Sequence, residues 1–185
     1  MLFRSGTGDG LKGIRDRALL LLGFAGAFRR SELVALDCED IEESETGLKI
    51  RIKFSKTDQE GEGATIAIVR GSIACPVEAL KAWRDAAGIT TGPVFCSIRK
   101  GGKVGARLSA QSVADVVKAH AENVGLDPAL FAGHSLRAGF LTSAAKRGAS
   151  IFKMMDQSRH RSVDTLRGYV RDAEIFKDHA GAGLL

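Results

Sequence analysis

An apolar run from Ala18 to Phe28 limits the folds open to this chain, because side chains of this kind must be covered by other protein atoms. The run extends a helical pattern that begins earlier, so we expect a buried helix over Leu11–Ala27. It is much shorter than the roughly 18 apolar residues of a membrane span, and no signal sequence opens the chain. The 185 residues therefore predict one globular, cytoplasmic domain packed around this helix.

The hydrophobic pattern changes its period after a second short helix expected over 31–35. Apolar and charged residues alternate through 48–54, which predicts a half-buried strand. Residues 64–69 predict a second strand across a polar loop, and 40–42 a short third one. Everything after this hairpin is expected to be helical. The predicted fold class is mainly α with a small antiparallel β-sheet (α+β).

Glycine, proline and serine mark the ends of the later helices. Pro76 suits a first helical turn, while Gly88, Gly125 and Gly148 each follow the last residue of a helical pattern. We expect helices over 76–87, 113–124 and 134–147, and helices beginning at Ser150, Ser162 and Asp172.

Charge is divided unevenly along the chain. The net charge is +5, yet residues 1–92 carry 13 Lys and Arg against 14 Asp and Glu, whereas residues 93–185 carry 14 against 8. A basic half suggests a polyanionic partner, with nucleic acid as the first candidate.

Cofactor motifs are missing from the sequence. The three cysteines, Cys38, Cys75 and Cys96, are widely spaced and are expected to be reduced, mostly buried thiols. There is no HExxH, no GxxxxGK loop and no paired-carboxylate signature. The sequence therefore favours neither a metal enzyme nor a nucleotide enzyme, and we expect no cofactor.

Two polar clusters lie beside apolar helices. His134 and Arg137 share one face at the start of an apolar helix, where a buried charge needs a partner or a function. Arg29 and Arg30 follow the most apolar helix, and Glu32 is placed to orient Arg29. These residues could form ordinary ion pairs or satisfy the last carbonyls of a helix, or they could bind a phosphate.

Three further residues are ordinary when taken singly. Tyr169, the only tyrosine, lies between Arg167 and Arg171, where positive charge would stabilise a phenolate. Lys56 lies in the hairpin loop, where most lysines are simply solvated. His160 stands between two arginines.

In chain order, however, these residues resemble the catalytic domain of the tyrosine recombinases, the phage integrase family. That family carries an ordered signature of Arg, Lys, His-x-x-Arg, His or Trp, and Tyr, and the resemblance runs from about Gly13 to about Phe176. The matching segments are 26–33 (GAFRRSEL), 55–57 (SKT), 133–137 (GHSLR), His160 and Tyr169.

The resemblance implies DNA strand cleavage and rejoining without metal or ATP. Tyr169 would attack phosphorus, release a 5′-hydroxyl and form a 3′-phosphotyrosyl bond. Arg29 and Arg137 would bind the non-bridging phosphate oxygens, where charge accumulates in the transition state. Arg29 rather than Arg30 is assigned because the family spacing puts the acidic residue three positions later, at Glu32.

The remaining roles also follow from the resemblance. Lys56 would protonate the leaving 5′-oxygen, and His134 would accept the tyrosine proton or hold the network in place. His160 would hydrogen-bond the phosphate. Family members commonly have glycine where this chain has Arg159, which would add a phosphate contact or displace His160. The arginines expected to contact DNA are Arg30, Arg159, Arg161, Arg167 and Arg171.

The expected domain organisation is a catalytic domain over 11–185, preceded by a linker stub over 1–10 and lacking the N-terminal core-binding domain of the family. The partner is double-stranded DNA, so the protein would be nucleoid-associated when bound. The resemblance implies a homotetramer on DNA, joined through a C-terminal segment over 172–185, and a monomer without DNA. That segment could equally fold back on its own domain.

Two other functions share much of this signature. A type IB topoisomerase has the same catalytic set, but it would relax supercoils as a monomer. A truncated or degenerate integrase would be a non-catalytic DNA-binding module. A third alternative is a helical regulator whose basic half merely binds DNA. It would give Lys56 and Tyr169 no function.

Overall fold

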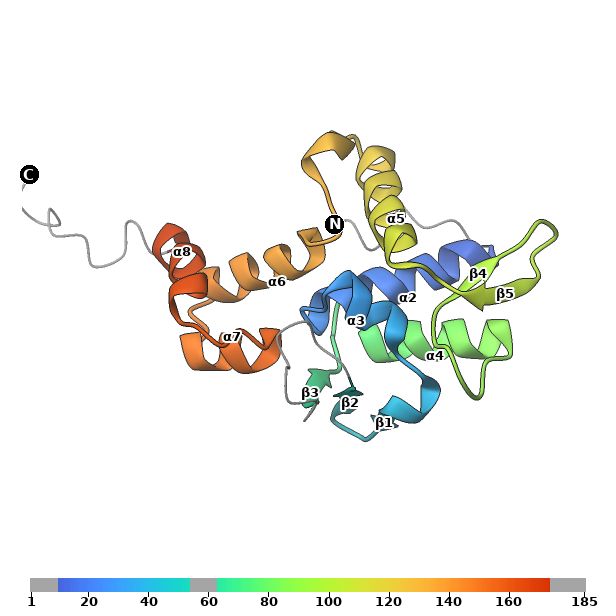
Figure 1. Ribbon diagram of the computed structural model, residues 1–185, viewed down its shortest axis with the longest axis horizontal. Coiled ribbons are helices and arrows are strands. Elements are labelled where there is room, and N and C mark those ends of the chain that lie inside the picture. Colours follow the sequence, from blue (N-terminus) through green and yellow to red (C-terminus); the bar gives the residue numbers. More distant parts are fainter. Residues whose placement is uncertain (1–9, 54–62, 174–185) are drawn as a thin grey trace, which may run out of the picture.

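The computed structural model describes residues 10–53 and 63–173. Two groups of elements lie side by side, with α2 to α5 and both sheets in a larger body and α6 to α8 beside it (Figure 1). The helices are α2 (Leu11–Ala25), α3 (Arg30–Ala35), α4 (Pro76–Ala87), α5 (Ala110–Asn123), α6 (Ser135–Lys146), α7 (Ile151–Ser158) and α8 (Asp164–Ala173). The strands are β1 (Ile41–Glu43), β2 (Gly47–Ile52), β3 (Ala64–Val69), β4 (Cys96–Ile98) and β5 (Val104–Arg107). The predicted fold class is confirmed.

The apolar run forms the predicted central helix. Leu19 and Leu22 of α2 are fully buried, and α4 packs against α2 through the equally buried Trp83. The helix ends at Ala25, two residues earlier than predicted, because the chain turns sharply at Ala27, whose φ of 45° lies in the left-handed region.

The first sheet also follows the prediction. Its strands are antiparallel in the order β1-β2-β3, with Ile50 opposite Ile66. Residues 48, 50 and 52 are buried and the intervening charged residues are exposed, which confirms the half-buried strand. β3 has the predicted bounds, and β1 begins one residue later than predicted.

Three sequence predictions are wrong in detail. Residues 96–107 are not helical but form the hairpin β4-β5, which turns through Gly101 and Gly102, both with positive φ. Helix α3 begins at Arg30 with Arg29 as its N-cap, because the Glu32 carboxylate accepts the Arg29 backbone N–H at 2.9 Å. Asp172 lies inside α8, so it does not start a separate helix.

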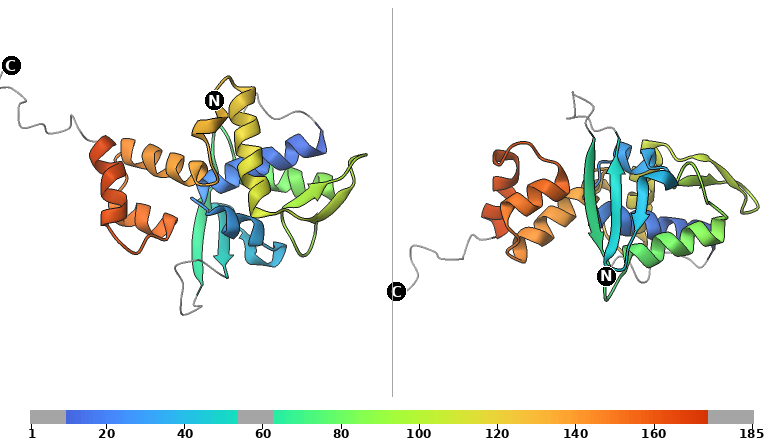
Figure 2. Two further views of the ribbon diagram at one scale, coloured as in Figure 1. Left: turned by 45° about the horizontal axis from the view of Figure 1, so that its top comes forward. Right: turned by 90° about the horizontal axis from the view of Figure 1, so that it is seen from below.

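Helices α6 to α8 have a small core of their own. Leu141, Ala145, Met154 and Leu166 are buried together, and Tyr169 packs against them. Figure 2 shows these helices to one side of the three-stranded sheet, with α6 running toward α2. The start of α6 and the end of α7 therefore meet the end of α2 at the junction of the two groups. No helix in the described ranges is long and apolar enough to cross a membrane.

Candidate active site

One pocket at this junction collects five of the sequence-predicted polar residues. It has a volume of about 270 Å³. Its lining residues are Arg29, His134, Arg137, Ala138, His160 and Tyr169. They come from the α2–α3 turn, the start of α6, the segment after α7, and α8, so the tertiary fold brings together residues that are 140 positions apart. Lys56 lies outside the described residues.

Arg29 is oriented by Glu32, as its spacing suggested. The Arg29 Nη1 donates to Glu32 Oε1 at 2.5 Å, and the Arg29 side chain is 15% exposed whereas that of Glu32 is 1% exposed. Burial raises the pKa of Glu32, but Arg159 and Arg29 outweigh it, so this pKa lies below the ordinary value. Glu32 is thus a buried anion between two guanidinium groups.

Arg137 is held at the first turn of α6 with its guanidinium inside the protein. Nη1 donates to the carbonyl of Ala27 at 2.7 Å, and Nη2 contacts His160 Nε2 at 3.1 Å. Burial, followed by the charges of Arg29 and Arg159, lowers the pKa of Arg137 to about 10. The guanidinium stays protonated at neutral pH. Because burial and two neighbouring positive charges destabilise this cation, an anion beside it would be favourable.

His160 has a defined tautomer. The Ser158 hydroxyl donates its one hydrogen to the Met154 carbonyl at 2.6 Å, so its oxygen must accept from His160 Nδ1 at 2.7 Å. Nδ1 therefore carries the proton, and Nε2 is left to accept from Arg137. Burial and the charges of Arg137 and Arg29 lower the pKa of His160 to about 4, which keeps the ring neutral at pH 7.

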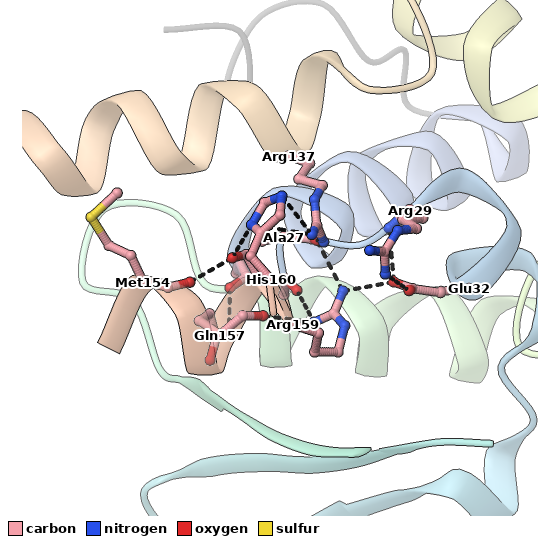
Figure 3. A network of polar contacts seen from close by, with 11 residues as sticks. Ala27, Arg29, Glu32, Arg137, Met154, Gln157, Arg159 and His160 are labelled. Carbon is pink, nitrogen blue, oxygen red and sulfur yellow. Dashed lines mark hydrogen bonds and ion pairs between the residues drawn. The ribbon is translucent and has the colours of Figure 1, made fainter. Parts of the chain in front are cut away.

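Arg159 does not point toward solvent, so the expected DNA contact by this residue does not fit the structure (Figure 3). Its guanidinium donates to Gly26 O and Ala27 O, both at 3.0 Å, and to Glu32 Oε2 at 2.6 Å. It also lies over the Phe28 ring, with Cζ 5.3 Å from the centroid. The physical reason is the buried carboxylate of Glu32. A buried charge is costly unless it is paired, so Glu32 draws the Arg159 guanidinium inward.

The remaining arginines predicted to contact DNA are exposed. Arg30 passes close to Gly133, where an added Cβ would lie 2.6 Å from the Arg30 Cδ. Arg161 and Arg171 are exposed, and Arg167 forms only an exposed ion pair with Asp164. His134, the N-cap of α6, is exposed, whereas Tyr169 is half-buried.

Sequence reasoning missed how the end of α2 is held. Three consecutive carbonyls, of Ala25, Gly26 and Ala27, accept hydrogen bonds from Gln157, Arg159 and Arg137. The arginines that follow α2 do not make these bonds. Such partners, more than 100 residues away, leave no local pattern, although arginine in place of the family's usual glycine at 159 was a signal.

A larger groove does not contain this combination of side chains. A groove of about 820 Å³ runs between β3, α2 and the α6–α7 helices, and it is lined mainly by apolar side chains. Across residues 10–53 and 63–173, no group of three or more His, Cys, Asp and Glu side chains is arranged to hold a metal ion.

Known proteins are similar to this chain over nearly its whole length. The sequence model of the phage integrase family matches residues 7–174. An integrase/recombinase XerD homolog of Selenomonas ruminantium is 47% identical over 173 residues, which covers 92% of this chain and 51% of that protein. Tyrosine recombinase XerC of Syntrophus aciditrophicus is 30% identical over 159 residues, which covers 85% of this chain and 49% of that protein.

Solved structures share the fold. XerH site-specific recombinase, in a post-cleavage complex with palindromic difH substrate, superposes with a TM-score of 0.75 at 18% identity, covering 94% of this chain and 47% of that one. XerA recombinase superposes with a TM-score of 0.70 at 19% identity, covering 91% and 54%. The chain thus spans about half the length of the relatives it matches.

Proposed function

Since the chain belongs to the phage integrase family, we propose that it cleaves and rejoins DNA strands at specific sites through a covalent bond to Tyr169. The observation that carries this proposal is the single pocket lined by Tyr169, two arginines and two histidines. Relatives named tyrosine recombinase support the same activity. A non-catalytic DNA-binding module would leave Tyr169 without a role, and the relatives are named recombinases rather than topoisomerases.

In the proposed reaction the Tyr169 oxygen attacks the scissile phosphorus. A phosphorus–tyrosine oxygen bond forms, the bond from phosphorus to the 5′-oxygen breaks, and the released 5′-hydroxyl takes a proton. The phosphotyrosyl bond retains the energy of the phosphodiester, so a second 5′-hydroxyl can reverse the step without ATP. Arg29 and Arg137 neutralise the charge that builds up on the non-bridging oxygens.

The remaining roles are assigned to three other residues. His134 lines the pocket with Tyr169, and we assign it as the acceptor of the tyrosine proton. Lys56 is the proposed general acid for the leaving 5′-oxygen. His160 is the proposed phosphate ligand: a bound phosphate would attract a proton to its Nε2, which could then donate a hydrogen bond.

Double-stranded DNA is the proposed partner, and the nucleoid the proposed location. The exposed Arg30, Arg161, Arg167 and Arg171 are the proposed backbone contacts, because exposed guanidinium groups beside a phosphate-binding pocket attract the neighbouring phosphates. The Tn1549 transposon integrase, which shares the fold, is described as in complex with a circular intermediate DNA. A homotetramer on DNA, joined through the C-terminal segment, is the proposed assembly.

A cleavage-trapping experiment tests the proposed reaction. The protein is incubated with nicked duplexes whose sequence is randomised around the nick, so that the unknown target site is represented. Cleavage beside the nick releases a short strand and traps the enzyme on DNA. We expect a covalent protein–DNA band on a denaturing gel, and sequencing the trapped DNA identifies the target.

Tyr169→Phe is the matched control, because it removes one oxygen and keeps the ring that packs in the small core. The band should vanish in Tyr169→Phe and fall by about 100-fold or more in Arg137→Ala. A band that persists in Tyr169→Phe would refute the nucleophile assignment. A wild-type protein that retains DNA but never forms the band would favour the binding-module alternative, and relaxation of a supercoiled plasmid by monomers would favour the topoisomerase alternative.

A further inference from the structure

Arg159 is held in an unfavourable backbone conformation. Its φ of 58° lies in the left-handed region that favours glycine, and it terminates α7. A non-glycine residue remains in such a conformation only where its surroundings fix it strongly. Here all side-chain contacts go inward, to the α2–α3 turn, the Phe28 ring and the backbone of Gln157. The side chain thus has a function that glycine could not serve.

The contact with Glu32 connects Arg159 to the candidate active site. Glu32 Oε2 accepts both from Arg159 Nη2 at 2.6 Å and from the Arg29 backbone N–H at 2.9 Å. Glu32 Oε1 accepts from Arg29 Nη1 at 2.5 Å. Each oxygen of the Glu32 carboxylate therefore has a hydrogen-bond partner (Figure 3). The orientation of this carboxylate determines where the Arg29 guanidinium lies.

The summed charge of Glu32, Arg29 and Arg159 also connects Arg159 to the candidate active site. A glutamate paired with Arg29 alone would cancel the positive charge that Arg29 offers to a phosphate. With two arginines on one carboxylate, the three groups keep a net charge of about +1 next to the buried Arg137. Arg159 thus lets Glu32 orient Arg29 without neutralising it.

We propose that Arg159 is a positioning residue, which fixes the Glu32 carboxylate so that the Arg29 guanidinium faces the pocket. This role rests on the proposed DNA cleavage, since it is for that reaction that Arg29 must be oriented. Arg159 itself does not touch the DNA.

The first test needs neither DNA nor activity. The Arg29 amide proton reports the position of Glu32 Oε2, because the two are hydrogen-bonded. By amide hydrogen exchange followed by NMR, we expect this proton to exchange at least tenfold faster in Arg159→Met than in the wild type. Arg159→Lys, which keeps a cation within reach of Glu32, should restore most of the protection.

Two further variants make this test decisive. Arg159→Gly removes the side chain while relieving the left-handed backbone, so it gives the same readout if Arg159→Met does not fold. Arg70→Met is the matched control, because Arg70 also joins two glutamates, Glu43 and Glu78, but on the surface beyond β3. Unchanged Arg29 protection in both Arg159→Met and Arg159→Gly would overturn the proposal.

The second test uses the nicked duplex. A positioning role predicts that Arg159→Met lowers the single-turnover rate of covalent adduct formation by tenfold or more at saturating protein. The Kd for the duplex and its salt dependence should stay within twofold of the wild type. A phosphate contact would instead weaken binding and reduce the salt slope by about one, and a purely structural role would lower Tm without changing the rate per folded molecule.

These two tests separate the inference from the proposed function. Absence of any adduct in the wild type would count against the proposed cleavage, whereas the amide exchange of Arg29 would still decide whether Arg159 fixes Glu32. A cleavage rate that is equal in Arg159→Met, Arg159→Gly and the wild type would reject the positioning role even if cleavage itself were confirmed.

Discussion

The protonation of His160 depends strongly on its neighbours. Ser158 assigns the proton to Nδ1, and Arg137 occupies the other ring nitrogen. Burial, followed by the charges of Arg137 and Arg29, disfavours a second proton on the ring, which is why the pKa of His160 falls to about 4. The imidazole is therefore neutral at pH 7.

Acidification should destabilise the protein through this residue. The folded-state pKa of His160 lies below the ordinary 6.5, so the unfolded chain binds the proton first as the pH falls. The stabilisation is complete above about pH 6.5 and is lost as the pH falls toward about 4. We expect the urea midpoint to fall between pH 7 and pH 5, and to fall less in His160→Gln.

NMR titration of the His160 ring provides a direct check on this prediction. The neutral form with the proton on Nδ1 should persist from pH 7 to pH 5 in the protein without DNA. A ring that titrates at its ordinary value near 6.5, or that carries its proton on Nε2, would contradict the geometry described above.

At the scale of elements, the Gln157 amide is one of the contacts that join α7 to α2. The Gln157 side chain donates to the carbonyl of Ala25 at 2.8 Å and to that of Ala67 at 3.0 Å, so it joins α7 to α2 and to β3. These carbonyls belong to the larger body, whereas Gln157 belongs to the α6–α8 group. The hydrogen bonds thus help to set the distance between the two halves of the pocket.

We expect Gln157→Ala to lower the free energy of unfolding by about 1–2 kcal/mol, because two acceptors lose their donor. Urea denaturation of both proteins measures this difference. Gln111→Ala serves as the matched control, since Gln111 is exposed on α5 and its amide contacts only Asp115; it should change stability by less than about 0.5 kcal/mol. Equal effects of the two substitutions would show that the junction does not depend on Gln157.

At the scale of the whole molecule, two apolar cores of unequal size flank the pocket. The larger core surrounds α2 and the three-stranded sheet, and the smaller one holds α6, α7 and α8 together around Leu166. Elements with few buried apolar contacts open at lower free energy. The α7–α8 pair, which carries Tyr169, is therefore the part of the described structure that should open first.

Native-state hydrogen exchange should resolve this difference. We expect the amides of α7 and α8 to exchange by opening at lower free energy than those of α2. Leu166→Ala, which removes the fully buried side chain of the small core, should lower the opening free energy of α7 and α8 by about 2–5 kcal/mol. The same substitution should leave α2 nearly unchanged, and an equal loss in both regions would instead indicate a single cooperative unit.

The sequence by itself determined the helices and strands with strong patterns, and it singled out five residues that line one pocket in the structure. Buried α2, the half-buried β2 and the α4 helix between Pro76 and Gly88 follow from hydrophobic periodicity and from end signals, which are local properties. The hairpin β4-β5 was not predicted, because its strands have 3 and 4 residues, β5 shows no buried and exposed alternation, and no strongly patterned strand lies beside them in the sequence. The order of Arg29, His134, Arg137, His160 and Tyr169 indicated the family before any geometry was known.

Only the tertiary structure decided what surrounds those residues. The inward turn of Arg159 and its contact with Glu32 join segments more than 100 residues apart. So do the hydrogen bonds from Arg137 and Arg159 to the carbonyls that follow α2. Local sequence carries propensity and periodicity, whereas a buried charge takes whichever partner the fold brings near it. Arg159 was therefore expected to contact DNA, and the folded chain places it against Glu32, behind Arg29, instead.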